Sequence, residues 1–267
     1  MSARDKLMRR RLLVAVLLIL AGCARTPPDT PSQSEHAMTL DQRVSGYAGT
    51  PTDWRRFLDC WSREVGQARS AGPEPLVATV ALPLEEGALE RTIEERQRAL
   101  GVALPRSYLD FIRAQRPQAD WRTIAHGTGF LSLGTVDTVA RLDPEGLALA
   151  QAQPLHADDD RYFVYGIDQD SATTRSRYLQ DALVVGKYGD SLYEQIVLFP
   201  QARTRDGEME AALLGWSGTF RATSFAELMR QLHYFDLGRS DQLPPYAQDR
   251  LRGTCADAMP MREVWWK

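Results

Sequence analysis

The sequence predicts an α+β domain, with helices flanking a mixed, mostly antiparallel sheet of about five to six strands and an extra helix before it. Three observations predict this class. Amphipathic helical patterns come first along the chain, short apolar runs of strand length follow them, and one further helical pattern closes the domain. Segregated helices and strands are typical of α+β domains. The 267 residues are enough for one substantial domain with extensions.

The first 22 residues have the composition of an export signal. Five basic residues lie between positions 4 and 11, and an apolar run begins at Leu12. The run ends at Ala24 after 13 residues, whereas a membrane-spanning helix needs about 20. The tetrapeptide Leu20-Ala21-Gly22-Cys23 resembles the lipobox of bacterial lipoproteins. This resemblance implies cleavage before Cys23 and lipid attachment to its thiol.

The resemblance also implies a cellular location for the mature chain. Residues 23–52 are polar and rich in proline, so we expect a lipidated tether. Ala24, rather than Asp, follows the cysteine, and the enteric sorting rule then points to the outer membrane, on its periplasmic side. More than one acyl chain is needed for stable anchoring, which a multiply acylated cysteine supplies.

The charge and the cysteines limit the partners of the mature chain. After cleavage it has 27 Lys and Arg against 34 Asp and Glu, a net charge of −7. This balance excludes a nucleic-acid footprint and favours a basic protein partner. Once Cys23 carries lipid, Cys60 and Cys255 remain, and in an oxidising compartment we expect a disulfide between them. Two separate reduced thiols are the alternative. No CxxC motif or Cys/His cluster supports a metal site.

The first helical pattern lies in an N-terminal extension, 53–81. Five apolar side chains recur at helical spacing after Thr52 or Asp53, which can cap the helix; they are Trp54, Phe57, Leu58, Trp61 and Val65. Alternation at 76–82 then predicts a strand. A helix over 89–100 is expected to end at Gly101, and Pro105 is expected to start another.

Short apolar runs follow, divided by Gly, Asp and Pro. Each run has the length of a strand; the runs are 130–133, 162–167, 182–188, 193–199 and 211–216. Gly189-Asp190 predicts a tight reversal between two of them. Ser224-Phe225-Ala226-Glu227 matches a capping box, so a final helix begins there. A C-terminal extension, 236–267, completes the chain.

Three motifs in this order resemble the SUKH superfamily, which includes yeast cell-wall assembly regulators and many bacterial toxin-immunity proteins. The first runs from Leu89 through Gly101 and Leu104-Pro105 to Phe111, the second from Val185 to Tyr193, and the third from Thr223 to Leu228. The resemblance covers about 150 residues and implies one SUKH-like domain at 82–235. Where family members often carry Asn-Gly after the second helix, this chain has Gln115-Arg116-Pro117.

Several patterns for catalysis or metal binding are incomplete. Gly215 to Thr219 approaches a nucleophile elbow, but its fifth residue is Thr rather than Gly and no long helix follows directly. His126 and His156 could in principle supply a base and an acid, but isolated histidines in loops are more often simply solvated. Asp168, Asp170 and Ser171 resemble the start of a calcium loop, yet the later EF-hand ligands are missing.

The remaining candidates form a partner-binding site. Two acidic runs lie in neighbouring loops, where charge of one sign can steer a basic partner; they are Asp158, Asp159, Asp160 and Asp168, Asp170. The resemblance implies an immunity protein that neutralises a delivered toxin by binding it, with no catalytic residue, metal or cofactor. An envelope scaffold or regulator with an endogenous partner is the second hypothesis, because fold does not determine function. An enzyme is the third.

Overall fold

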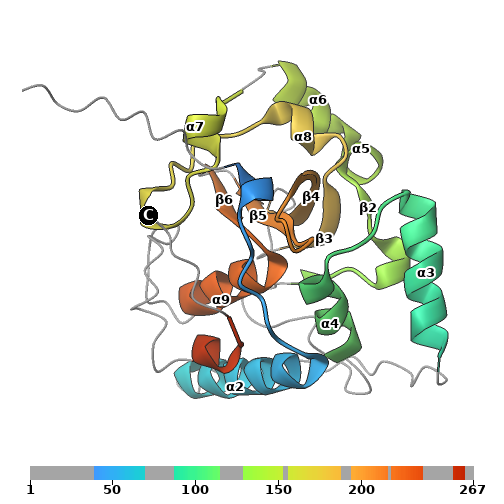
Figure 1. The fold of residues 1–267 in the computed structure, drawn as a ribbon, viewed down its shortest axis with the longest axis vertical. Coiled ribbons are helices and arrows are strands. Elements are labelled where there is room, and N and C mark those ends of the chain that lie inside the picture. Colours follow the sequence, from blue (N-terminus) through green and yellow to red (C-terminus); the bar gives the residue numbers. More distant parts are fainter. Residues whose placement is uncertain are drawn as a thin grey trace, which may run out of the picture. The chain divides into compact units, whose positions relative to one another are not determined.

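The computed structural model is built on one sheet of six strands (Figure 1). The strand order is β1 (Gly129–Phe130), β3 (Leu183–Lys187), β4 (Gln195–Arg203), β5 (Met209–Gly215) and β6 (Gly218–Ala222), and β2 (Asp137–Thr138) also pairs with β3. Every pairing among the described strands is antiparallel. The predicted α+β class and strand number are confirmed, while the mixed character expected for the sheet is not seen in these pairings.

The described part of the chain comprises seven segments of one compact unit, 36–267; they are 39–69, 87–114, 129–152, 156–187, 194–215, 218–236 and 255–261. Cys23, the tether up to residue 38, the strand expected at 76–82 and the reversal at Gly189-Asp190 lie outside them. None of the described helices is long and apolar enough to cross a membrane.

Long helices cover one face of the sheet, here called the first face. They are α2 (Pro51–Arg69), α3 (Ala88–Leu100), α4 (Arg106–Ala114) and α9 (Phe225–Asp236), joined by the short helix η5 (Cys255–Ala258). Strand residues such as Ile196, Leu198 and Leu213 alternate inward and meet the helices in one apolar core. The four long helices confirm the helical patterns, and Gly101 ends α3 with a φ of 68°, a conformation that glycine adopts without strain.

Short helices cover the opposite face, here called the second face. They are α5 (Val139–Leu142), α6 (Pro144–Ala152), α7 (Asp159–Tyr162) and α8 (Ser176–Leu179), with 3-10 turns η1 (Leu40–Gln42) and η4 (Gly166–Asp168). The 3-10 turn η3 (Leu133–Thr135) instead packs against α3, and its Leu133 belongs to the first-face core. A second core separates the short helices from the sheet and includes Val184, Val197 and Ala212, the strand residues that alternate with those of the first face. Figure 1 shows the two groups of helices on opposite sides of the strands.

Three of the five apolar runs are strands of about the expected length, and the other two differ. Runs 182–188, 193–199 and 211–216 are confirmed as β3, β4 and β5. Run 130–133 is a two-residue strand that gives way to η3, and β6 was not anticipated. Run 162–167 is not a strand, because Asp158 caps a helical turn at its start and Tyr162, Phe163 and Tyr165 all pack into one core instead of alternating.

Residues 39–50, expected to be part of the tether, join the two faces. Leu40 is buried in the second core and Tyr47 in the first. Between them the backbone carbonyl of Arg43 accepts a hydrogen bond from Arg205 N at 2.8 Å, and Ser45 donates from N and Oγ to Asp206 at 2.9 and 2.7 Å. This segment therefore passes round the turn between β4 and β5.

Candidate functional site

The two cysteines of the folded body are bonded to each other. The Cys60–Cys255 disulfide links α2 to η5 across 195 positions of sequence, with a Cα–Cα distance of 5.5 Å. Glu64 is close to both sulfurs, and among the described residues these three form the one group with the spacing of a metal site. Because both sulfurs are used in the disulfide, they offer no thiolate to a metal.

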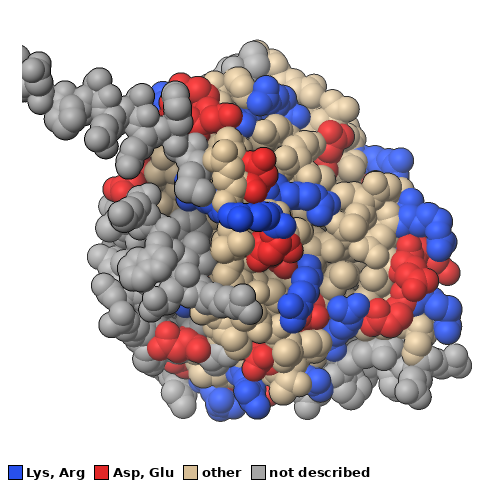
Figure 2. Space-filling model, viewed as in Figure 1, with Lys and Arg blue, Asp and Glu red and all other residues tan. Residues whose placement is uncertain are grey.

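The acidic runs lie side by side on the second face. We call Asp158, Asp159, Asp160, Asp168 and Asp170 the acidic surface; all five are exposed. Arg161 Nη2 lies 3.5 Å from Asp170 Oδ2, so the α7 run and the η4 run meet through this exposed ion pair. Figure 2 shows acidic side chains gathered over α7, with basic side chains beside them. The structure thus brings together all five residues that the sequence indicated.

Local hydrogen bonds shape each half of the acidic surface. Asp158 caps α7 by accepting a hydrogen bond from Arg161 N at 3.2 Å. Asp170 closes its own turn by accepting from Ala172 N at 2.9 Å and from Thr173 Oγ1 at 3.2 Å. The bond from Ala172 N, followed by that from Thr173, lowers the pKa of Asp170. Its carboxylate is therefore firmly ionised at neutral pH.

Arg175 ties the acidic surface to the second core. Its guanidinium donates to the carbonyl of Ala157 at 3.1 Å and to Tyr178 Oη at 2.8 Å, and it pairs with Asp159. The same guanidinium lies 4.3 Å from the ring centre of Tyr162, within cation–π range. The side chain of Arg175 is buried, although its partner Asp159 is exposed. Arg175 therefore attaches the acidic surface to the core, while the carboxylates themselves face solvent.

The charge of the acidic surface is partly offset. Arg161 pairs with Asp170 and Arg175 with Asp159, while all five carboxylates remain exposed to solvent. An excess of exposed charge of one sign raises the association rate with an oppositely charged partner, and salt weakens the effect. The arrangement suits long-range attraction of a basic surface.

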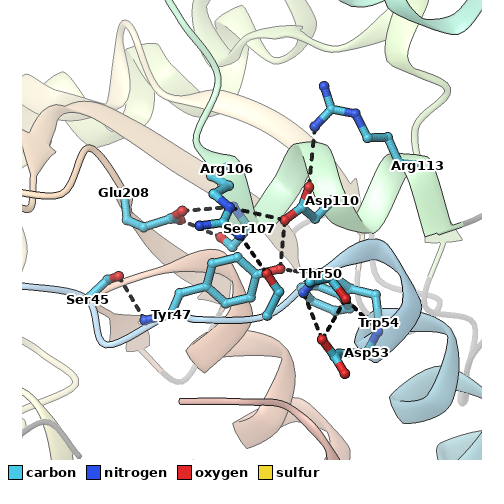
Figure 3. Close-up of polar contacts among 11 residues, drawn as sticks. Ser45, Tyr47, Thr50, Asp53, Trp54, Arg106, Ser107, Asp110, Arg113 and Glu208 are labelled. Carbon is cyan, nitrogen blue, oxygen red and sulfur yellow. Dashed lines mark hydrogen bonds and ion pairs between the residues drawn. The ribbon is translucent and has the colours of Figure 1, made fainter. Parts of the chain in front are cut away.

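A second polar cluster, which the sequence analysis missed, is buried on the first face (Figure 3). Glu208 accepts hydrogen bonds from Ser107 N at 2.8 Å and from Ser107 Oγ, and so satisfies donors in the first turn of α4. Asp110, one turn later, accepts from Tyr47 Oη at 3.1 Å, and Tyr47 Oη accepts from Trp54 Nε1 at 3.0 Å. These bonds join residues 47–54 to α4 and to the β4–β5 turn.

Burial determines the acid–base state of this cluster. Desolvation raises the pKa of Glu208 to about 7, although its bonds from Ser107 oppose the shift. Burial, followed by the charge of Asp110, raises the pKa of Tyr47. A serine hydroxyl beside such a carboxyl group resembles an acid–base pair, but both groups are almost fully buried. The geometry therefore supports a structural role, in which the cluster attaches residues 47–54 to α4. The cluster also contains Glu208, a carboxyl group whose ionisation depends on pH.

The other residues considered for catalysis are not brought together. His126 lies outside the described residues, and His156 is exposed, forming an isolated backbone bridge with Arg175. Gly215 ends β5 and Gly218 begins β6, and the two residues pair in an antiparallel hairpin. A nucleophile elbow connects a strand to a helix instead. One signal for the missed cluster was present, since Glu208 and Glu210 alternate with Met209 directly before the apolar run 211–216.

Comparison of the sequence with models of protein families and with curated proteins finds no match. The resemblance to the SUKH superfamily therefore depends on the three motifs and their order alone. Two of these motifs include described helices in the first-face core, α3 with α4 and α9.

Proposed function

We propose that this chain is an exported lipoprotein whose folded domain binds a basic protein, and that this partner is a toxin delivered into the periplasm. The observation that carries the proposal is the acidic surface. Two runs of carboxylates that are eight or more positions apart in sequence form one exposed patch, anchored from below by a buried arginine. The net charge of −7 expected for the mature chain favours the same kind of partner.

The proposed mechanism is occlusion. A bound immunity protein covers the active site of the toxin or blocks its assembly, and neither action needs a catalytic residue. The lipid at Cys23 confines the domain to the membrane surface through which the toxin arrives, and confinement raises the effective concentration of the binding site. The SUKH-like motifs support this function because the superfamily includes many toxin-immunity proteins.

A deletion strain tests the immunity proposal directly. The strain is challenged by sister cells that carry a secreted effector encoded beside this gene, with delivery of the effector verified. We expect the deletion strain to die and the complemented strain to survive. Equal survival of both would remove immunity, and the envelope scaffold would then be the better proposal.

A charge-neutralised variant tests the acidic surface. Changing Asp158, Asp159 and Asp160 to Asn is expected to slow association with the toxin and to weaken the salt dependence of that rate. A matched control neutralises three exposed acidic residues on first-face helices, by Asp59→Asn, Glu94→Gln and Glu95→Gln. Stopped-flow association at two salt concentrations compares the variants. An equal slowing in both would show that net charge, not this surface, attracts the partner.

A further inference from the structure

A pocket of about 560 Å³ lies on the second face, between the sheet and helices α5, α6 and α8. Its walls are mainly apolar, and its apolar lining includes Val139, Leu147, Leu179, Phe199 and Leu214. Leu149 also lines the pocket, and 72% of its surface is exposed to solvent. A concave, mainly apolar volume of this size is typical of sites for small molecules.

Two buried arginines line the same pocket. Arg175 and Arg221 retain only 4% and 1% of their exposure, and both guanidinium groups lie over the ring of Tyr162, at 4.3 and 4.2 Å from its centre. The polar groups of Arg175 are used by Ala157, Asp159 and Tyr178. The guanidinium of Arg221 is different, because among the described residues only its Nη1 finds an acceptor, the carbonyl of Tyr162.

The unused donors of Arg221 define one edge of its guanidinium. Nε and Nη2 are buried and have no hydrogen-bond partner among the described residues. These two nitrogens point their hydrogens in parallel, and this is the edge that holds a carboxylate through two hydrogen bonds. A buried donor left without a partner costs about 1–3 kcal/mol. Both atoms have less than 1 Å² of accessible surface, so a ligand anion reaches this edge only when the Arg221 side chain turns toward the pocket, and its two bonds would then remove that cost.

The neighbouring carboxylates are already bonded to neutral groups. Glu210 accepts from Tyr162 Oη at 2.5 Å and from Tyr165 Oη, and burial raises its pKa against the opposing effect of Arg221. Asp143, in the pocket lining, accepts from Gln195 Nε2 and from Gly146 N, each at 2.9 Å. Neither carboxylate forms a hydrogen bond with Arg221 in the described structure.

We propose that this pocket binds a small amphipathic carboxylate, whose apolar body lies against the α6 and α8 walls and whose anionic group pairs with Arg221. The proposal goes beyond the capture of a protein partner and does not depend on it. The apolar lining supplies affinity by burying the ligand body, and Arg221 supplies selectivity for the anion. The ligand takes its place beside Tyr162, which also belongs to the helix of the acidic surface.

Isothermal titration calorimetry with three eight-carbon probes tests the charge requirement. The mature protein without lipid is titrated with octanoate, octanol and octylamine. We expect saturable 1:1 binding of octanoate, at least tenfold tighter than that of octanol, and no binding of octylamine. Equal affinities for octanoate and octanol, tighter binding of octylamine, or the lack of saturation by octanoate would overturn the proposal.

Two tryptophan variants of α6 test the location. Ala150 lines the pocket and Ala148, on the same helix, is exposed and does not line it. We expect Ala150→Trp to lower octanoate affinity at least tenfold and Ala148→Trp to leave it unchanged, with circular dichroism verifying that both variants fold. Equal losses, or no loss in either, would overturn the assignment to this pocket.

An Arg221→Gln variant tests the anion site. If it folds, we expect the preference for octanoate over octanol to vanish while octanol affinity is kept. A retained preference would contradict the role of Arg221. The tryptophan pair decides the location even if this variant does not fold, and none of these titrations involves a toxin, so their outcome is separate from that of the immunity test.

Discussion

The two faces of the sheet are covered in different ways. Helices of 9–19 residues cover the first face, and their buried aromatic side chains pack around Phe225, with Trp54, Phe111 and Phe130 at ring-centre distances of 5.1–6.1 Å. On the second face, three of the four helices are only four residues long, and the core between them contains Arg175, Arg221 and Glu210.

This difference separates stability from binding. Isolated helices of four residues are not stable in water, so the second-face helices depend on tertiary contacts. Ionisable groups are buried on both faces, Glu208 on the first and Arg175, Arg221 and Glu210 on the second, but the large cluster of well-packed aromatic side chains around Phe225 stabilises the first face. The acidic surface and the pocket both lie on the second face. We infer that the first face carries most of the stability and leaves the second face free for ligands.

The largest expected loss of stability comes from disrupting the first-face core. Trp54 is fully buried, contacts Phe111 and Phe225, and donates to Tyr47. Replacement by Ala should lower the free energy of unfolding by about 3–5 kcal/mol, measured by urea denaturation. Leu147→Ala on the second face should cost only about 2 kcal/mol, since that side chain already borders the open pocket. Equal costs would contradict the comparison.

Removal of the disulfide should have the next largest effect. The Cys60→Ser, Cys255→Ser double variant should lose about 2–5 kcal/mol of unfolding free energy, because the bridge closes a long loop and holds η5 against α2. Denaturation of the parent with a reductant should match that of the double variant. Mass spectrometry that finds both thiols free in protein from the periplasm would show that the bridge does not form there.

A pH-dependent effect should follow from Glu208. Its pKa is about 7 in the folded protein against an ordinary value of 4.5, so the folded state binds a proton more tightly than the unfolded state. The free energy of unfolding should therefore fall as pH rises from about 4.5 to 7, by about 3 kcal/mol in all.

The Glu208→Gln variant should abolish that part of the pH dependence, because an amide does not ionise in this range. Its oxygen can still accept the bond from Ser107 N, so the fold is kept. Denaturation at pH 5 and pH 8 measures both proteins, with Glu145→Gln on the exposed side of α6 as a control. A parent whose stability is the same at both pH values would contradict an ionisable group buried at this position.

The smallest effect on stability should come from the acidic surface. Changing Asp160 and Asp168 to Asn should alter the free energy of unfolding by less than about 0.5 kcal/mol, since both side chains are exposed. Thermal denaturation measures the change. A large loss would show that these carboxylates hold the second-face loops and would weaken their assignment to partner binding.

The sequence by itself determined the elements with a strong local pattern. The stripe around Trp54, the capping residue Ser224 and the stop at Gly101 predicted α2, α9 and the end of α3, because helical periodicity and capping involve neighbours in the chain. Short apolar runs likewise predicted β3, β4 and β5. The even remainder of cysteines predicted the pairing of Cys60 with Cys255, which the structure contains.

Only the tertiary structure decided the second face and the buried polar clusters. The run 162–167 has the composition of a strand, yet Tyr162 and Tyr165 turn inward to bond Glu210, some 45 positions away. Ser107 meets Glu208 across 101 positions, and no local pattern records such a pair. Short helices and buried ionisable groups gain their stability from distant residues, so their conformation becomes defined only when the sheet brings those residues together.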